Sequence, residues 1–421
     1  MTKHHTRRKG NAVHAVTKAI LQYHHGRDSE RVGMKLAGLR ANPFAFFRGT
    51  APLFYSTLPM HRALADSPLV LACGDLHLEN FGSYKGDNRL VYFDTVDFDE
   101  ACVAPVGFEL ARFLTSILVA AKPLKFSDAT AAKLVTGFIE SYAVSIASAK
   151  PRWVERSLAT GPVRKLLQSL KGRHRSDLVA QRTVRKAGKI KLVIDGKRTL
   201  AITPQDRARA ESILAAYAST QAATGSFEPI DVARRISGNG SLGLERFVAL
   251  VRGNGNADGQ TLIDIKLTSP SALSAHIETP QPRWRSEAER VVSIQRIVQA
   301  IPPAMLGAVG FGKRSYLIKE LEPTADRVNL AALGGKSGSL SNVIRTMAEV
   351  TAWGHLRACG RFGAGPIETL GRFVGHTAWR GRITQCAYDA QALALQQWQA
   401  YSADYDADAT GLLSTLSEKQ S

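Results

Sequence analysis

The sequence predicts an α+β protein, in which long helices and a β-rich region are built from different segments. Two kinds of pattern predict this class. Apolar residues recur at helical spacing in four segments, which are 105–121, 128–147, 286–300 and 341–362. Apolar, β-branched runs typical of strands occupy 247–251, 261–267 and 315–321, and a Gly- and Asn-rich turn separates the first two.

Composition agrees with a globular chain. With 421 residues and 44% hydrophobic content, the chain can form two or three compact units. The longest apolar run, from Phe113 to Ala121, is too short for a membrane span, and the N-terminus MTKHHTRRKG lacks the apolar stretch of a signal peptide. We therefore expect a cytoplasmic protein. The four cysteines form no CxxC pair and are expected to be reduced and mostly buried.

The formal net charge of +19 favours anionic partners. Nucleotides, phosphorylated metabolites, nucleic acid and anionic lipid headgroups all satisfy this condition, so charge alone does not choose among them. Between residues 164 and 198 there are twelve Lys or Arg against only Asp177 and Asp195. This segment is interpreted either as a module that binds a polyanion or as a solvated basic face.

The first 150 residues begin with a basic, His-rich segment over 1–40. Its first ten residues are expected to form a mobile tail, followed by a helix from Ala12 to Tyr23. The helices expected at 105–121 and 128–147 are apolar enough to lie in the core. The chain then becomes basic around 150–225, where KLVIDGKRTLAI predicts a hairpin because its Asp-Gly pair favours a tight turn.

The stretch 71–99, LACGDLHLENFGSYKGDNRLVYFDTVDFD, carries the strongest functional signal. Asp75 lies five residues before Asn80, and a short strand from Leu90 to Phe93 leads to a second carboxylate, Asp97. Such hard oxygen groups on adjacent segments are typical of a phosphoryl-transfer site. We expect Asp75 to accept the proton of an incoming hydroxyl, and Asn80 and Asp97 to provide oxygen ligands to Mg²⁺.

Two motifs in this stretch resemble those of known kinases. GDLHLEN resembles the catalytic loop of aminoglycoside phosphotransferases and choline kinases, and VDFDEA stands where those kinases carry their metal-binding Asp motif. Together with PFAFFRGTAP at 43–52, nearly the whole chain is similar to the bacterial DUF2252 family, which is grouped with kinase-like folds and has no assigned substrate. The resemblance implies a protein-kinase-like, aminoglycoside phosphotransferase-like two-lobe fold. It also implies that Glu109 holds the catalytic loop in place.

A glycine-rich motif follows in the β-rich region. Gly238, Gly240 and Gly243 form a GxGxxG pattern, which by itself fits either a Rossmann turn or a phosphate loop of the kinase type. The strand-like residues that follow favour the kinase type, because a Rossmann fingerprint needs a helix there. Asp264 lies where a ribose-binding acid would fall, so the Rossmann alternative remains open.

In the kinase-like interpretation, the glycines and Lys266 bind the phosphates of ATP. A carboxylate of the helix at 286–300 would orient the lysine, with Glu289 as first choice and Glu287 as second. The alternative for Lys266 is a solvent-exposed lysine at a strand edge. Arg48 is expected to contact the substrate or the acidic loop, or to form a structural ion pair with Glu79 or Asp99.

The order of these segments differs from that of an ordinary kinase. The catalytic loop and metal motif precede the glycine loop and lysine, so we expect a circularly permuted arrangement with an inserted basic helical module. Five regions follow from this interpretation: a basic tail and helix (1–40), the catalytic-loop half of the helical lobe (41–150), the basic module (151–228), a nucleotide-binding lobe (229–325) and a completing helical segment (326–421).

Three functions are compatible with the sequence. The first is an ATP- and Mg²⁺-dependent phosphotransferase acting on a hydroxyl-bearing small molecule. The second is nucleotidyl transfer from the same site, with ATP bound in the opposite orientation. The third is a non-catalytic pseudokinase or basic scaffold, which would bind nucleic acid or a protein partner through residues 164–198 with a steep salt dependence.

Overall fold

The computed structural model describes residues 13–58, 61–222, 224–238, 240–253, 259–322 and 326–408. The tail expected over the first ten residues lies outside this part of the chain. The helices are α1 (Ala15–Tyr23), α2 (Ser29–Arg40), α3 (Pro43–Gly49), α4 (Ala51–Ser56), α5 (His61–Ala65), α6 (Val106–Ala120), α7 (Asp128–Ala147), α8 (Gly161–Ser169), α9 (Arg175–Arg182), α10 (Pro204–Ala218), α11 (Glu287–Val298), α12 (Ser337–Ala358), α13 (Ile367–Gly375) and α14 (Ala378–Asp406). The strands are β1 (Leu69–Ala72), β2 (Phe81–Lys85), β3 (Val91–Thr95), β4 (Cys102–Pro105), β5 (Thr183–Lys186), β6 (Lys189–Leu192), β7 (Thr199–Leu200), β8 (Pro229–Arg235), β9 (Arg246–Val251), β10 (Thr261–Leu267), β11 (Gly307–Phe311) and β12 (Arg314–Glu320).

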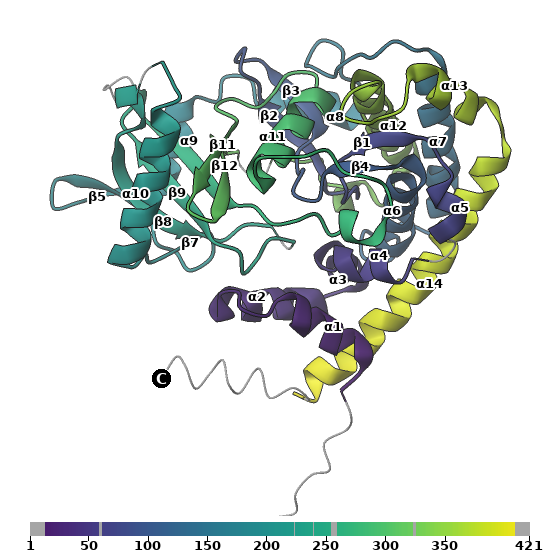
Figure 1. Ribbon diagram of the computed structural model, residues 1–421, viewed down its shortest axis with the longest axis horizontal. Coiled ribbons are helices and arrows are strands. Elements are labelled where there is room, and N and C mark those ends of the chain that lie inside the picture. The colour runs from purple at the N-terminus through teal and green to yellow at the C-terminus, as the bar shows by residue number, and fades with distance from the viewer. Residues whose placement is uncertain are drawn as a thin grey trace, which may run out of the picture.

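The architecture confirms the predicted α+β class. A six-stranded antiparallel sheet in the order β11-β12-β10-β9-β8-β7 occupies the left part of Figure 1, and the helical region lies to its right. Side chains alternate between the faces of a strand, so each face has its own composition. One face packs against α10 through an apolar cluster that includes Phe247, Ile263 and Ile265. The opposite face is apolar at Val248 and Leu262, and carries charged residues further along the same strands.

The helical region is organised around α6, of which every residue is buried. Helices α7, α12 and α14 contribute to the same apolar core, and two short strand pairs, β1–β4 and β2–β3, lie against it. Local sequence explains where several helices begin. Ser127 caps α7 by accepting a hydrogen bond from the Thr130 N–H, and Asn42 caps α3 in the same way just before a proline. The four apolar segments predicted to be helical are all helices.

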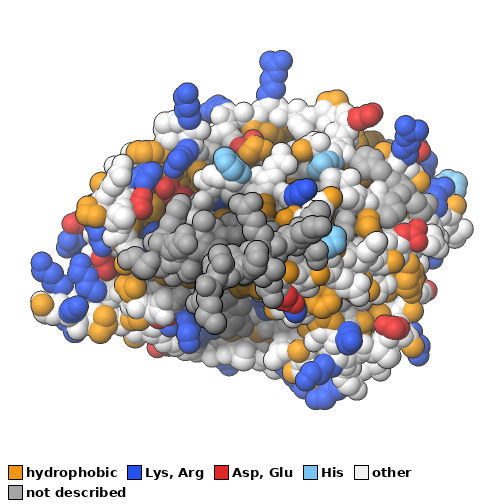
Figure 2. Space-filling view, turned by 90° about the horizontal axis from the view of Figure 1, so that it is seen from below, with side chains coloured by type: hydrophobic (Ala, Val, Ile, Leu, Met, Phe, Trp, Pro, Cys, Tyr) orange, Lys and Arg blue, Asp and Glu red, His pale blue; other side chains and the backbone are white. Residues whose placement is uncertain are grey.

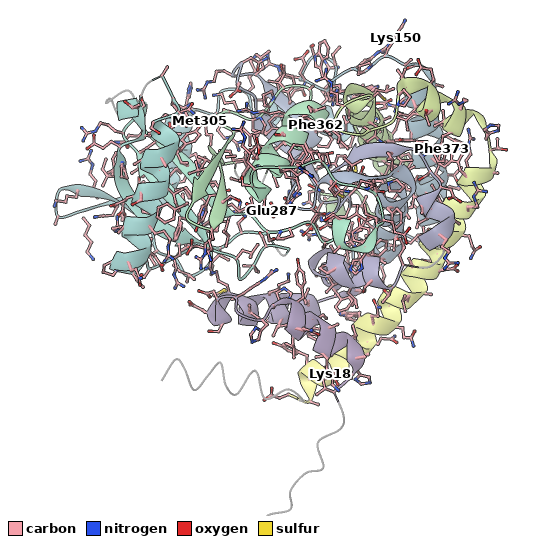
Figure 3. All side chains as sticks on the ribbon, viewed as in Figure 1. Lys18, Lys150, Glu287, Met305, Phe362 and Phe373 are labelled. Atoms are coloured by element: carbon pink, nitrogen blue, oxygen red, sulfur yellow. The ribbon has the colours of Figure 1, made fainter. Side chains whose placement is uncertain are left out.

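The N-terminal helices and α14 are joined near the bottom of Figure 1. The Asp404 carboxylate accepts hydrogen bonds from the His14 N–H and from the Thr17 hydroxyl, at 2.9 and 2.6 Å. The Tyr401 hydroxyl donates to the Leu36 carbonyl at 2.7 Å. Lys18, labelled in Figure 3, lies on α1 beside this junction. The first and last described helices are therefore neighbours in space.

The basic segment after residue 150 differs from its prediction in two respects. KLVIDGKRTLAI does not pair with itself, because β6 pairs with β5 across a turn at Ala187 and Gly188, and β7 pairs with β8. In addition, β7 and α10 belong to the six-stranded sheet and its apolar cluster, so 228 is not a structural boundary. The local Asp-Gly turn does form around Asp195, but tertiary pairing selects other partners for its flanking residues.

The state of the cysteines and the apolar character of the helices were both expected from composition. All four cysteines are free thiols, and Cys73, Cys102 and Cys386 are buried while Cys359 is partly exposed. Among the residues that the structure describes, no helix combines the length and apolar character needed to cross a bilayer.

Candidate functional site

A polar cavity of about 310 Å³ lies between the loop segment 73–100 and the charged face of the sheet. From the loop segment it is lined by Asp75, His77, Glu79, Asn80, Gly82, Ser83, Val96, Asp97 and Phe98. From the sheet and its preceding turn it is lined by Arg235, Ser237, Gly238, Gly240, Arg246, Asp264, Lys266, Leu317 and Lys319. Arg48, Gln295, Glu322, Asp326 and Arg327 complete the lining. Segments more than a hundred residues apart in sequence thus face each other.

Asn80 fixes the geometry of the loop segment. Its side-chain oxygen accepts a hydrogen bond from the Asp97 N–H at 2.8 Å. Its amide group donates to the carbonyls of Asp75 and Asp97, both at 3.1 Å. Asn80 is only 1% exposed, so these bonds form in a site shielded from bulk water. One buried amide therefore holds both predicted carboxylate positions at a fixed separation.

Glu109 on α6 holds the start of the same loop, as predicted. One carboxylate oxygen accepts from the N–H groups of Cys73 and Gly74, at 2.7 and 3.4 Å. The other oxygen contacts His355 Nε2 at 2.7 Å, and His355 Nδ1 contacts the Tyr142 hydroxyl at 2.8 Å. Burial alone would raise the pKa of Glu109, but these hydrogen bonds and the nearby imidazole lower it. The loop is thereby anchored to α6, α7 and α12.

Asp75 is held by a residue that the sequence interpretation did not identify, Arg112 on α6. The Arg112 Nε and Nη2 atoms both lie 2.7 Å from Asp75 Oδ1. The guanidinium is fully buried, donates to the Phe47 carbonyl at 2.9 Å and lies 4.0 Å from the Phe47 ring centre. Burial raises the pKa of Asp75, although Arg112 acts in the opposite direction. The sign of this role in the sequence is that Arg112 is a charged residue within a largely apolar helix.

Lys266 lies on β10 with its side chain pointing into the cavity. It is 4% exposed, so it is not a solvent-exposed edge lysine. Its Nζ atom is 3.6 Å from Asp97 Oδ1 and forms a closer ion pair with Asp99. Burial tends to raise the pKa of Asp97, but the charges of Lys266, Lys319 and Arg246 lower it. The structure therefore brings together three residues that the sequence predicted from two distant segments: Asn80, Asp97 and Lys266.

A second group of charges on the sheet face was not predicted as a unit. Asp264 is 1% exposed and pairs with two arginines, Arg246 on β9 and Arg235 on β8, each through a contact of 2.5 Å. These two guanidiniums lower the pKa of Asp264, against the effect of burial. The alternation of charged and apolar residues along β10, where Asp264 and Lys266 flank Ile265, is the signal that could have identified the group.

The three predicted glycines have different positions. Gly238 and Gly240 line the cavity, whereas Gly243 packs against α2, where a Cβ atom would lie 2.9 Å from Val32 Cγ2. The Gly240 carbonyl accepts a hydrogen bond from buried Lys35 Nζ at 2.8 Å. The chain then enters strand β9 instead of a helix, and Asp264 is paired with arginines. The Rossmann alternative is therefore wrong.

The expectation for the helix at 286–300 requires correction. Glu289 does not reach Lys266, because its carboxylate accepts from the Arg285 N–H at 2.6 Å at the start of α11. Glu287, labelled in Figure 3, bonds Arg290 Nε at 2.7 Å. Arg290 donates to the carbonyls of Asp99, Ala101 and Ser269, so α11 supports the residues that follow Asp97 through a buried guanidinium. The α11 side chain that lines the cavity is Gln295.

Arg48 forms an ion pair with Glu79, one of the two structural partners expected for it. Its side chain also lines the cavity. Within the basic segment 164–198, Arg173 donates a hydrogen bond to Asp326, which lines the cavity. Figure 2 shows Lys and Arg side chains spread over the visible face, with several at the left end of the molecule. In the β5–β6 hairpin, Arg185, Lys186 and Lys189 are exposed.

The donor atoms in the cavity fit a divalent cation that prefers oxygen. The Asp97 side chain is 52% exposed towards the cavity, and the Asn80 amide oxygen keeps one lone pair. Asp99, which pairs with Lys266 but does not line the cavity, has a buried Oδ1 atom without a hydrogen-bond partner among the described residues. Within that part of the chain, no group of three or more His, Cys, Asp or Glu is placed to hold a metal. Mg²⁺ commonly uses one or two carboxylates together with phosphate oxygens, and these residues suit that arrangement.

Fold and site together define an α+β protein with a charged cavity between a helical region and an antiparallel sheet. The chain belongs to the DUF2252 family, described as uncharacterized proteins conserved in bacteria, whose model matches residues 27–404. The membership inferred from the motifs is thus confirmed. No curated protein and no solved structure matches the chain.

Proposed function

We propose that this protein is an ATP- and Mg²⁺-dependent phosphotransferase with a circularly permuted, kinase-like two-lobe fold, which acts on a hydroxyl-bearing small molecule. One observation carries the proposal. Asp75, Asn80 and Asp97 line the same cavity as Gly238, Gly240 and Lys266, and Lys266 Nζ lies 3.6 Å from Asp97. Phosphoryl transfer needs this combination of a base, metal ligands and a phosphate-binding cation.

The arrangement of the chain supports the permuted form of the proposal. The sheet that contributes Lys266 follows the loop segment in sequence, yet the two regions face each other across the cavity. The present terminal helices, α1 and α14, are in contact, and a fold with adjacent termini tolerates a different starting point for the chain.

Each residue has a defined part in the proposed reaction. Bound Mg²⁺-ATP supplies the phosphoryl group and neutralises charge on its phosphates. Asn80 and Asp97 would hold the cation, and Lys266 would bind phosphate oxygens. Asp75 orients the acceptor hydroxyl and takes its proton, and burial favours this role because it raises the pKa of the carboxyl group. Arg112 keeps the Asp75 carboxylate facing the cavity.

The first test is calorimetric titration with ATP, with and without Mg²⁺, of the wild-type protein and of Asp97→Ala. We expect Mg²⁺-dependent binding that Asp97→Ala abolishes and that the matched variant Asp389→Ala, on the exposed side of α14, retains. Absence of ATP binding under both conditions would contradict the proposal and favour the scaffold alternative.

A second measurement identifies the reaction. Incubation with ATP labelled at the γ-phosphate or at the α-phosphate distinguishes phosphoryl from nucleotidyl transfer. We expect the γ-label to move to an acceptor. Movement of the α-label would instead assign nucleotidyl transfer to the same cavity.

A further inference from the structure

The end of the cavity near Asp75 has more positive than negative charge. Arg48 and Arg327 share a single carboxylate, Glu79: Arg48 forms an ion pair with it, and Arg327 Nη1 lies 3.8 Å from it. The other carboxylate at this end, Asp75, is already bonded to Arg112. Arg48, Arg112 and Arg327 thus share the two carboxylates Glu79 and Asp75, and the neighbouring Asp97 carboxylate lies 3.6 Å from Lys266 Nζ. The nearby pairs Arg173–Asp326 and Lys319–Glu322 are balanced and do not alter the excess.

Arg48 is the residue that shows this imbalance best. Its side chain is 16% exposed, and its guanidinium lies 5.5 Å from the Phe44 ring centre. Its Nε atom is buried and has no hydrogen-bond partner among the described residues. An unpaired buried donor is costly, and a guanidinium presents its donors in a fork that fits an oxyanion.

The electrostatic environment agrees with this geometry. Burial lowers the pKa of Arg48, and the charge of Arg327 contributes in the same direction although Glu79 opposes it. Burial also lowers the pKa of His77, with Arg48, Arg112 and Arg327 adding to the effect. Both residues therefore lie in a region where a further anion would be stabilised.

We propose that Arg48 and Arg327 bind an anionic group of the acceptor, so that the substrate is a hydroxyl compound that also carries a phosphate or a carboxylate. This inference rests on the proposed function, because it takes Asp75 as the group that receives the acceptor hydroxyl. The position of both arginines in the same cavity as Asp75 places the anion close to the reacting hydroxyl. Lys266 of the sheet and Asp97 of the loop segment remain available for the nucleotide.

The test is titration of the full-length protein with inorganic phosphate and, separately, with acetate, without nucleotide. Arg48→Gln and Arg327→Gln are the test variants, and Arg327 is the more exposed of the two, at 35% for its side chain. Arg89→Gln, which removes an exposed arginine paired with Glu320, is the surface control. Lys266→Met controls for anions bound at the nucleotide end. Isothermal calorimetry measures the dissociation constants.

We expect binding of at least one anion that weakens about tenfold or more in both test variants and is unchanged in Arg89→Gln. Lys266→Met should retain the anion binding that the two arginine variants lose. Phosphate alone would indicate a phosphorylated acceptor, and acetate alone a carboxylate. Binding that weakens only in Lys266→Met, or no binding of either anion, would overturn the inference. If the inference is overturned in either way, the ATP titration still tests the proposed function separately. We expect Arg48→Gln to bind ATP normally.

Discussion

The two sides of the cavity hold their functional groups in different ways. The loop segment 73–100 is held through its main-chain atoms: Asn80 bonds those of Asp75 and Asp97, and Glu109 of α6 bonds those of Cys73 and Gly74. On the sheet face, side chains mostly pair with one another, as Asp264 does with its two arginines. Hydrogen bonds to main-chain atoms therefore hold the loop segment in place, whereas ion pairs between side chains hold the charged groups of the sheet face. Substitutions on the two sides should have different consequences.

The largest expected effect is on chemistry, from Asp75→Asn on the loop side. The amide keeps a similar shape but cannot take a proton, so we expect kcat to fall by about 10²–10⁴-fold. ATP affinity should change little, because the proposed metal ligands Asn80 and Asp97 remain, as does Lys266. Phosphoryl-transfer assays and calorimetry on the same preparation measure both quantities. Equal activity of wild type and variant would remove Asp75 from the mechanism.

Glu109→Ala should show how strongly backbone anchoring contributes to stability. It leaves two N–H groups and His355 without their carboxylate, so we expect the free energy of unfolding to fall by about 3–5 kcal/mol. Urea denaturation measures the change. The control is Glu228→Ala, which breaks an exposed pair with Arg252 and should cost less than about 1 kcal/mol. Similar losses in the two variants would show that anchoring of the loop adds no stability.

Lys266→Met tests how a charged residue of the sheet face contributes to ATP binding and to stability. We expect ATP binding to weaken by about tenfold or more, because a charged hydrogen-bond donor to phosphate is lost. The loss of stability should be smaller than for Glu109→Ala, since Asp97 and Asp99 are both partly exposed. Calorimetry and urea denaturation of the same variant give the two values. A large stability loss with unchanged ATP affinity would make Lys266 a structural residue.

A pH-dependent effect is expected from Lys35, whose Nζ atom donates a hydrogen bond to the Gly240 carbonyl and so connects α2 to that turn. Burial lowers the pKa of Lys35 to about 7, with Arg27 adding to the shift and Glu100 and Asp75 opposing it. The unfolded chain keeps the ordinary, higher value, so between about pH 7 and 10 it binds more protons at this group. The stability of the wild type should therefore rise with pH over that range.

In Lys35→Met, this contribution to the pH dependence should be absent. Urea denaturation at several pH values between about 7 and 10 compares the variant with wild type and with Lys18→Met, which alters an exposed lysine of α1. Parallel pH profiles for wild type and Lys35→Met would contradict the assignment of a lowered pKa.

Much of the secondary structure was predictable because it depends on local periodicity. The helix at 128–147 and the strand at 261–267 have the predicted bounds, and Lys266 faces away from Ile265 because side chains alternate along a strand. The hairpin predicted at 191–202 was wrong because strand pairing is decided by the whole sheet. Glu289 was misassigned because helical spacing does not determine which side of a helix faces a cavity.

Local patterns and short motifs were enough to predict the α+β class, the family and the polar residues of the loop segment. Which distant charges meet depends on the tertiary structure. Three contacts join separate elements in this way. Arg112 bonds Asp75, Asp264 pairs with Arg235 and Arg246, and Arg290 bonds the Asp99 carbonyl. Long polar side chains reach across elements to satisfy buried charges, and their partners depend on packing that no local pattern encodes.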